Sequence, residues 1–367
     1  MVALSLKSMV KSMFGFSALS ALSTNKAAVS VLVIASALLV SQVQAATNSS
    51  HHRTKKAHAT KSSAHKSKAH VSKTAHAKLS KKSKHKALAA KASKPHTAQL
   101  AEDTRPSAGD IAGLKHIDAL ALASNVAFVV DQDSSKVLFE KNAEVSLPIA
   151  SITKLMTSLV VVEAKQDLNE MIEITNEDLD KEKGTGSRLA IGAKLSRADL
   201  LHIALMSSEN RAASALGRSY PGGLPAFVAA MNAKAKQLGM NDTSYVDSSG
   251  LSSKNVASAR DLVKLINAAY QYPLIREYST DSKYAVNPKG KQLLEYGTTN
   301  KLVASSDWNI GLQKTGYIAE AGRCLVMQAI IEGRAVVMVF LDSKGKYSRL
   351  ADAGRIKKWI TAMHPEG

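Results

Sequence analysis

The chain is nearly free of cysteine, with Cys324 as the only one among 367 residues. A single thiol excludes an intramolecular disulfide, although an exported compartment would permit one. The residues that follow it, Leu325-Val326-Met327, are apolar. We therefore expect Cys324 to be a buried structural thiol.

Acidic residues are missing from the first part of the chain. The first is Glu102, so all 30 Asp and Glu residues lie at or beyond position 102. Of the 49 Lys and Arg residues, 17 precede residue 100, which leaves 32 cations against 30 acids in the remainder. The net charge of +19 therefore belongs to the N-terminal part and says little about the partners of the folded part.

Long apolar runs are also scarce. One run extends from Ala27 to Val40 after a lysine-bearing lead, and the small residues of Val43-Gln44-Ala45-Ala46 follow it. This order predicts a secretory signal peptide over residues 1–45, cleaved near Ala45, and hence a periplasmic protein. Because the lead is long, an uncleaved inner-membrane anchor is the alternative, and an organelle transit peptide a further one. No later run approaches the roughly 18 apolar residues that span a bilayer.

Residues 46–99 consist almost entirely of Lys, His, Ser, Thr and Ala. Such a segment cannot bury enough apolar surface to offset chain entropy, so we expect a disordered linker. We interpret it first as a solvated spacer and second as an adhesive tail for an anionic envelope polymer or lipid. Metal binding by its irregularly spaced histidines is a third, unspecific interpretation. Nucleic acid is not expected as a partner, because export removes that target.

A globular domain is expected over residues 118–367, after a second linker with a short helical piece at 100–117. It opens with strands at 127–130 and 137–139, joined by a polar turn. Gly333-Arg334 marks a later hairpin.

The elements between and after these strands are mostly helical. Apolar periodicity and capping residues predict helices over 151–162, 196–206, 224–238, 259–272 and 347–363, and the hairpin strands cover 325–332 and 335–342. This order predicts an α+β domain in which helices flank an antiparallel sheet.

Ser151 and Lys154 lie at the start of the first helix, three residues apart. This spacing places both side chains on one helix face. A serine hydroxyl becomes nucleophilic when a neighbouring group takes its proton, and Lys154 is the candidate base. Because an ordinary lysine is protonated at neutral pH, this role demands burial or a nearby cation. Taken alone, a serine and a lysine at this spacing also occur on ordinary helices without a catalytic role.

Two tripeptides follow in the chain. Ser208-Glu209-Asn210 is expected at a helix-to-loop transition, where Ser208 is placed to relay a proton and Asn210 to orient a substrate amide and Lys154. Taken alone, this tripeptide and the second one, Lys314-Thr315-Gly316, are each common in turns.

Lys314-Thr315-Gly316 is expected just before a late strand. Its lysine supplies positive charge that would favour a neutral Lys154, its threonine hydroxyl binds a carboxylate, and its glycine lets a substrate approach the backbone. The order and spacing of all three motifs predict a serine acyl-transfer site.

With these motifs, residues 120–364 resemble the serine D-alanyl-D-alanine peptidases of the S11 type, the low-molecular-mass penicillin-binding proteins that process peptidoglycan. Further family-like stretches are Asp131–Lys141, Leu147–Ser151, Asp247–Leu251 and Ala321–Leu325. The resemblance implies a β-lactamase/transpeptidase-like fold, with the active site between the sheet and a helical subdomain.

The resemblance also implies a role for each site residue. These are Ser151 as acylated nucleophile, Lys154 as base, Ser208 and Asn210 as relay and orienting group, and Lys314, Thr315, Gly316 and Tyr317 as substrate contacts. The backbone N–H groups of Ser151 and Tyr317 would form the oxyanion hole, where one donor is typically worth about 10²–10³ in rate. The implied partners are peptidoglycan peptide stems and, as covalent inhibitors, β-lactams; no metal or cofactor is implied.

Internal cleavage of D-alanyl cross-links is the leading interpretation. Many carboxypeptidases of the family have a hydroxyl residue where this chain has Ile318. Carboxypeptidase action on a terminal D-alanine is the runner-up, and an inactive cell-wall-binding module is the alternative from another class. A β-lactamase is disfavoured, because no Glu-x-x-Leu-Asn sequence lies between Asn210 and Lys314.

Overall fold

The structure is a computed structural model that describes residues 105–114, 118–288 and 293–363. The expected signal peptide and the Lys/His-rich linker lie outside the described residues. Within the described ranges, no helix combines the length and the apolar character needed to cross a bilayer.

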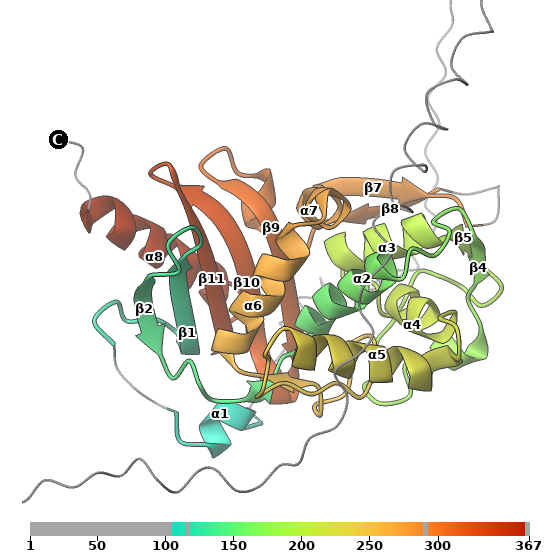
Figure 1. Cartoon of the computed structure of the whole chain (residues 1–367), viewed down its shortest axis with the longest axis horizontal. Coiled ribbons are helices and arrows are strands. Elements are labelled where there is room, and N and C mark those ends of the chain that lie inside the picture. The colour runs from blue at the N-terminus through green and yellow to red at the C-terminus, as the bar shows by residue number, and fades with distance from the viewer. Residues whose placement is uncertain (1–104, 115–117, 289–292, 364–367) are drawn as a thin grey trace, which may run out of the picture. The chain divides into compact units, whose positions relative to one another are not determined.

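A five-stranded antiparallel sheet, in the order β2-β1-β11-β10-β9, forms one half of the domain (Figure 1). Its strands are β1 (Ser124–Asp131), β2 (Val137–Lys141), β9 (Asn309–Ile318), β10 (Gly322–Ile331) and β11 (Arg334–Ser343). The first strands of the domain therefore pair with the last ones. Strand β9 is left at an edge, with one side paired to β10 and the other directed toward the helical half.

The two faces of the sheet pack against different helices. Side chains alternate between the faces along each strand, so Val126 and Ala127 belong to different apolar clusters. Helix α6 (Ala259–Tyr270) covers the face of Val126, and α8 (Ser348–Met363) covers the face of Ala127 (Figure 1). Both faces are thus buried, as an α+β architecture requires.

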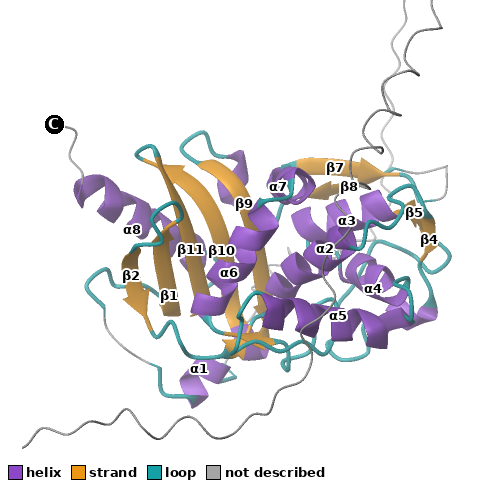
Figure 2. Ribbon diagram, viewed as in Figure 1, coloured by secondary structure: helices purple, strands orange, loops and turns teal. Residues whose placement is uncertain are grey.

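The helical half lies beyond the β9 edge (Figure 2). Its helices are α2 (Thr153–Glu163), α3 (Arg197–Met206), α4 (Asn210–Arg218), α5 (Gly223–Gln237) and α7 (Pro273–Thr280). Its two-stranded ribbons pair β4 (Met171–Glu173) with β5 (Lys194–Ser196) and β7 (Lys283–Val286) with β8 (Leu294–Gly297). The shorter elements are α1 (Ala108–Ile111), β3 (Leu147–Pro148), β6 (Val256–Ala257) and the 3₁₀ turns η1 (Ala150–Ile152), η2 (Asn176–Asp178), η3 (Lys301–Ala304) and η4 (Ala319–Ala321).

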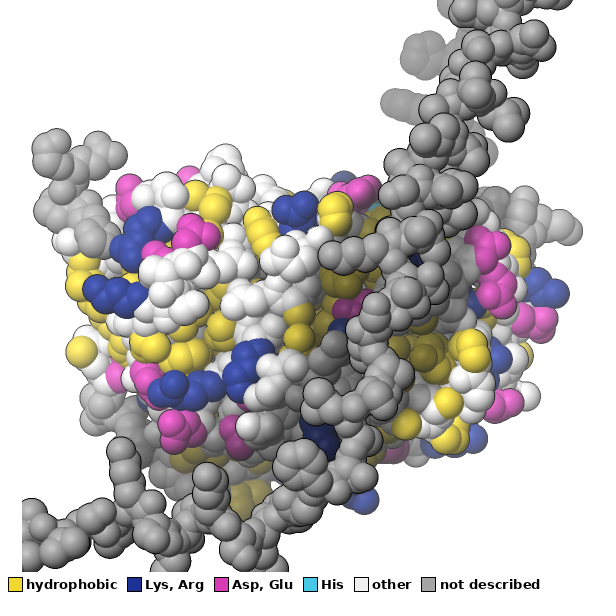
Figure 3. All heavy atoms as spheres, viewed as in Figure 1, with side chains coloured by type: hydrophobic (Ala, Val, Ile, Leu, Met, Phe, Trp, Pro, Cys, Tyr) yellow, Lys and Arg dark blue, Asp and Glu magenta, His cyan; other side chains and the backbone are white. Residues whose placement is uncertain are grey.

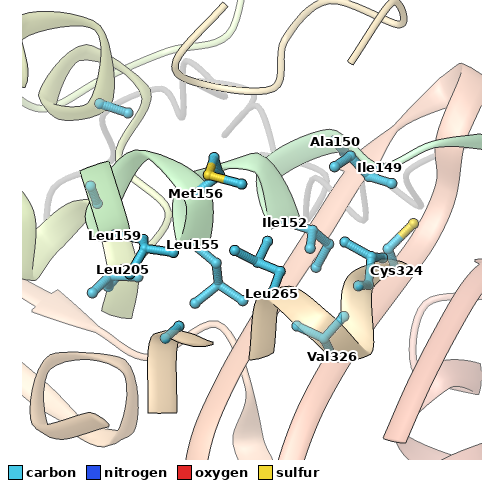
Figure 4. Close-up of a cluster of buried hydrophobic side chains, with 14 of the residues drawn as sticks. Ile149, Ala150, Ile152, Leu155, Met156, Leu159, Leu205, Leu265, Cys324 and Val326 are labelled. Atoms are coloured by element: carbon cyan, nitrogen blue, oxygen red, sulfur yellow. The ribbon is translucent and has the colours of Figure 1, made fainter. Parts of the chain in front are cut away.

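Turn η1 and helix α2 run through the middle of the larger apolar cluster. All residues of α2 from Thr153 to Val161 are buried, which is the state expected of a helix that is apolar on most sides. Figure 4 shows Ile152 and Leu155 in one cluster with Leu265 of α6 and Val326 of β10. The segment that carries Ser151 and Lys154 is therefore held between the sheet and the helices.

Most predicted elements are confirmed. The expected α+β class, the late hairpin and the buried Cys324 are all present. Helix α3 begins with the predicted capping box, in which the N–H of Asp199 donates to the Ser196 hydroxyl at 3.0 Å. Helix α1 lies within residues 100–117, where the sequence predicts a short helical piece.

Two placements differ from the sequence predictions. Lys314-Thr315-Gly316 lies inside β9, where no strand is predicted, and the predicted later strand follows it as β10. Its polar residues break the apolar alternation, but pairing with β10 supplies the strand's hydrogen bonds. Ser208-Glu209-Asn210 joins two helices and is not followed by a loop, because Glu209 caps α4 and Asn210 is its first residue.

Charges of both signs are interspersed on the face shown in Figure 3. This agrees with the near balance of 32 cations and 30 acids beyond residue 100. The basic character of the chain is therefore a property of its N-terminal part.

Candidate active site

Ser151 and Lys154 are brought together by the turn that leads into α2. Ser151 lies in η1 and is half-buried, whereas Lys154 is the second residue of α2 and is fully buried. The distance from Lys154 Nζ to Ser151 Oγ is 2.9 Å. This is a direct hydrogen-bond distance, as proton transfer between a nucleophile and its base requires.

Two further oxygen atoms contact the Lys154 nitrogen. The side-chain Oδ1 of Asn210 lies at 2.8 Å and the backbone carbonyl oxygen of Ser249 at 2.6 Å, and neither can donate a proton to it. A neutral amine has two N–H groups, which these two acceptors occupy. Its lone pair is then left for the hydroxyl hydrogen of Ser151.

Burial favours that neutral form. It lowers the pKa of Lys154 to about 7, while the charges of Asp247 and Glu209 act in the opposite direction. The expected repulsion between Lys314 and Lys154 is present, since the charge of Lys154 lowers the pKa of Lys314, but it is secondary to burial. Burial is the dominant cause, and it also lowers the pKa of Lys314 well below its usual value, with the charge of Lys154 as a further cause.

The loop that begins at Asp247 holds the Ser249 carbonyl in place. One carboxylate oxygen of Asp247 accepts hydrogen bonds from the N–H groups of Ser249 at 2.6 Å and Gly250 at 2.5 Å, and the other accepts from Ser252 N–H at 2.9 Å. Gly250 has a φ of +81°, and a Cβ there would lie 2.0 Å from the carbonyl oxygen of Ala150. Only glycine fits this close approach to the turn that carries the nucleophile.

Two site segments have left-handed backbone at residues other than glycine. The φ angle is +47° at Ala150 and +64° at Ser208. Such conformations cost free energy, and they concentrate at functional sites where the surrounding structure enforces them. At Ser208 the result is a hydroxyl directed to the second lysine, with Lys314 Nζ donating to Ser208 Oγ at 2.9 Å.

Strand β9 supplies the opposite wall. Lys314 is fully buried, and its Nζ also donates to the carbonyl oxygen of Thr315 at 2.8 Å. The hydroxyl of Thr315 hydrogen-bonds that of Thr299 at 2.6 Å. A Cβ on Gly316 would lie 2.8 Å from the Ile149 carbonyl oxygen and 3.1 Å from the backbone nitrogen of Ser151. The strand therefore approaches the nucleophile turn through its glycine.

Tyr317 is the next residue after this approach. Its side chain is 45% exposed, and the guanidinium of Arg323 lies 4.3 Å from its ring centroid. Tyr317 lies opposite Arg323 of β10 and follows Gly316 directly. This position is compatible with the expected contribution of the Tyr317 N–H to an oxyanion hole.

Two features beside the site are not predicted from the sequence. Arg349 of α8 is buried, its charge contributes to lowering the pKa of Lys314, and its Nε has no hydrogen-bond partner among the described residues. The Asn210 amide donates from Nδ2 to the hydroxyl of Thr185 at 3.0 Å. No local sequence pattern marks Arg349 or Thr185, because each reaches the site from a distant segment of the chain.

The predicted residues therefore form two connected groups. Ser151, Lys154 and Asn210 make one, and Ser208 and Lys314 make the other. Thr315, Gly316 and Tyr317 continue from Lys314 along β9. In the part of the chain that the structure describes, no three His, Cys, Asp or Glu side chains cluster as metal ligands.

Solved structures share the fold of this domain. The domain is similar to a Streptomyces DD-transpeptidase, with a TM-score of 0.60 and 25% identity over 66% of this chain and 98% of the other. It is also similar to a penicillin-binding protein of Listeria monocytogenes in a cefotaxime-bound form, with a TM-score of 0.58 and 28% identity over 65% of this chain and 96% of the other.

Relatives matched by sequence have a higher identity to this chain than these solved structures. The chain is 48% identical over 240 residues to a D-alanyl-D-alanine endopeptidase of Pseudomonas aeruginosa and 46% identical over 242 residues to one of Escherichia coli. Each match covers 65% of this chain and 77% of the relative. Residues 114–345 match the peptidase S11 family, described as D-alanyl-D-alanine carboxypeptidase. This match spans more than half of the chain, which therefore belongs to the peptidase S11 family of D-alanyl-D-alanine peptidases.

Proposed function

We propose that this protein is an exported serine endopeptidase that hydrolyses D-alanyl cross-links between peptidoglycan peptide stems. The observation that carries the proposal is the buried Lys154 nitrogen, 2.9 Å from Ser151 Oγ and with both of its N–H groups directed to other acceptors. The names of the Pseudomonas and Escherichia relatives support internal cleavage as the reaction.

Acylation begins with transfer of the Ser151 hydroxyl proton to neutral Lys154. The Ser151 oxygen forms a bond to the D-alanyl carbonyl carbon, and the carbonyl oxygen becomes an oxyanion beside the N–H groups of Ser151 and Tyr317. The bond from carbon to the leaving amine then breaks. The amine takes a proton from the Ser208 hydroxyl, which Lys314 contacts at 2.9 Å, and Ser208 is reprotonated by the proton that Lys154 took from Ser151. Lys154 is then neutral again for the next step. The products of this half-reaction are a D-alanyl ester on Ser151 and a free amine.

Deacylation follows the same steps with water as the nucleophile. The water oxygen attacks the ester carbon while Lys154 takes a proton from the water. Ser151 recovers its hydroxyl proton from Lys154 when the ester bond breaks. Lys314 and the Thr315 hydroxyl contact a substrate carboxylate on the leaving side, since a cation beside a hydroxyl suits an anionic group. A β-lactam acylates Ser151 by the same steps. The resulting ester is hydrolysed slowly, because this chain lacks the additional glutamate base expected of a β-lactamase.

The runner-up activity is removal of a terminal D-alanine. The family is described by that reaction, whereas Ile318 is buried and offers no hydroxyl to a free terminal carboxylate. Incubation of the purified protein with cross-linked muropeptide dimers distinguishes the two reactions. Monomers are the expected product, and free D-alanine with intact dimers would overturn the endopeptidase assignment.

Mass spectrometry after penicillin exposure tests whether the protein is an enzyme at all. We expect a covalent adduct on the wild type and none on Ser151→Ala. A wild type without an adduct would favour an inactive wall-binding module. The adduct also tests Ser151 as nucleophile independently of the natural substrate.

Export is part of the proposal and rests on the sequence of residues 1–45. Cell fractionation followed by N-terminal sequencing should find a periplasmic chain that begins near Ala46. An intact N-terminus in the membrane fraction would indicate the anchor instead. For the basic segment 46–99 we propose a spacer, with adhesion to anionic polymer or lipid as the alternative; salt-sensitive sedimentation of the full chain with anionic vesicles would support adhesion.

A further inference from the structure

A histidine of α3 is enclosed between two tyrosine rings. His202 is 4% exposed, and its ring is stacked on that of Tyr278 in α7, with centroids 4.2 Å apart and planes inclined by 6°. The ring of Tyr284 in β7 is also stacked on it, at 3.8 Å and 25°. Because two stacked rings cannot occupy the same face, the tyrosines enclose the histidine from both sides. One side chain thus connects α3 to α7 and to β7.

The flat faces of the imidazole carry this connection. The Nε2 atom of His202 lies 2.9 Å from Oδ2 of Asp281 at the end of α7, but it is not aligned for a hydrogen bond. The Tyr284 hydroxyl donates to Oδ1 of Asp199 in α3 at 2.6 Å, which fixes that tyrosine ring against α3. Stacked aromatic rings stabilise a contact beyond the apolar area that they bury. The stack therefore holds α3 and α7 together.

Helix α7 is in turn bonded to the strand of the second lysine. It lies between α3 and β9 (Figure 1). Ser279 follows Tyr278 and is fully buried, and its carbonyl oxygen accepts from Gln313 Nε2 at 2.6 Å. Its hydroxyl oxygen accepts from the backbone N–H of Gln313 at 3.4 Å. Because Gln313 immediately precedes Lys314 in β9, a shift of α7 would move the segment that carries Lys314.

Helix α3 leads to the other partner of that lysine. It ends at Met206, and the N–H of Glu209 donates to the carbonyl oxygen of Ile203 in its last turn at 3.1 Å. Ser208 lies between them, and its hydroxyl oxygen accepts from Lys314 Nζ at 2.9 Å. The contacts therefore form a closed network, from α3 through the stack to α7, from α7 to β9, and from Lys314 back to the end of α3.

We propose that His202 is a positioning residue whose stacked ring sets the distance between Ser208 and Lys314. This inference rests on the proposed function, in which Ser208 gives a proton to the leaving amine. Ser151 and Lys154 belong to η1 and α2, which lie outside the closed network. Loss of the stack should therefore impair protonation of the leaving group and spare the nucleophile and its base. A misplacement of about 1 Å can cost roughly 10² in rate.

The test compares two substrates that share the D-alanyl acyl group and carry a carboxylate on the leaving side. One is the cross-linked amide, whose leaving amine needs a proton. The other is a thioester of a mercapto acid, whose thiolate leaves without one because a thiol has a pKa of only about 8.5. For both substrates kcat/KM reports acylation, so the ratio of the two values isolates the protonation of the leaving group.

Three variants change the stack. His202→Ala removes the central ring, His202→Phe keeps a flat ring without nitrogen atoms, and Tyr278→Ala removes the partner on α7. Tyr278 is only half-buried, so its variant tests the stack even where His202→Ala does not fold. Phe227→Ala is the matched control, since it removes a fully buried ring of α5 that belongs to a different ring pair, with Tyr220. Thermal denaturation verifies that each variant is folded.

His202→Ala and Tyr278→Ala should each lower kcat/KM for the amide by roughly tenfold and leave the thioester within about twofold. The loss is moderate because Thr299 also connects α3 to β9, with its N–H on the Met206 carbonyl at 3.2 Å and its hydroxyl on Thr315. His202→Phe should keep both activities within about twofold of wild type, and the control should change both equally. The double variant should lose no more than the more impaired single variant, because both changes break one contact.

Three results would overturn the positioning role. These are equal losses on the amide and the thioester, no loss on the amide, and a His202→Phe variant as impaired as His202→Ala. A wild type that cleaves the thioester but no amide would overturn the proposed function, and the positioning role with it.

Discussion

The side-chain nitrogen of Lys154 lies 2.6 Å from the backbone carbonyl oxygen of Ser249, a residue 95 positions further along the chain. This contact and the one to Asn210 use both N–H groups of a neutral Lys154 amine, so its lone pair is directed toward the Ser151 hydroxyl. The loop behind the carbonyl is organised by Asp247, whose charge also acts on Lys154. Backbone geometry and electrostatics at the base are therefore coupled through one loop.

Asp247→Asn should shift the pH dependence of acylation. The charge of Asp247 raises the pKa of Lys154, so removing it should lower that pKa and move the acidic limb of the rate profile to lower pH. Glu209→Gln should shift the limb in the same direction for the same reason. The exposed Asp242 serves as the control, and Asp242→Asn should leave the limb in place. A shift of the Asp247→Asn limb to higher pH would contradict this account.

Lys154→Arg should abolish most acylation. A guanidinium remains protonated at any pH at which the protein is folded, so it cannot take the Ser151 proton. We expect the second-order rate constant for penicillin adduct formation to fall by roughly 10²–10⁴. Stopped-flow or quenched mass spectrometry measures it, and thermal denaturation verifies that the variant is folded. An acylation rate within about tenfold of wild type would exclude Lys154 as the base.

Acylation of the free enzyme should increase with pH through about 7. Because burial lowers the pKa of Lys154 to about 7, the neutral form required for proton transfer is scarce below that pH and predominates above it. The rate should therefore fall about tenfold per pH unit on the acidic side. A profile that is flat from pH 5 to 8 would refute this assignment.

Gly250→Ala should destabilise the domain much more than Gly333→Ala. Both glycines have left-handed backbone, with φ of +81° and +70°, but only the Cβ at 250 meets other atoms, at 2.0 Å from the Ala150 carbonyl oxygen. The Gly333 variant should lose about 1 kcal/mol of unfolding free energy and the Gly250 variant about 3 kcal/mol or more. Urea denaturation measures both values. Similar losses would show that conformation alone, without the close contact, sets the cost.

The thiol of Cys324 should be unreactive in the folded protein. It is fully buried, and burial raises its pKa to about 12, so little thiolate forms at pH 8. An aromatic disulfide reagent should report no free thiol in native protein and one thiol after denaturation in guanidinium. Rapid reaction in the native state would mean that this part of β10 opens to solvent.

Local patterns account for the parts of the fold that could be predicted. The capping box of Ser196 and Asp199 acts over three residues, and the turn after Ile331 joins two apolar strands directly. Strand β9 is not predicted, because its polar motif hides the alternation of apolar residues and only pairing with β10 makes it a strand. Helix α4 was missed because a polar capping segment resembles a turn when its neighbours in space are unknown.

The sequence by itself determined that a serine and a lysine share one face at a helix start, and that two more motifs follow in the order of a serine acyl-transfer site. Only the tertiary structure decided what those residues can do. Lys154 is a candidate base because distant elements bury it, and His202 of α3 stacks on Tyr278 of α7. The physical reason is that helix periodicity and capping act over a few residues, whereas desolvation, charge fields and ion pairs depend on groups that folding brings together.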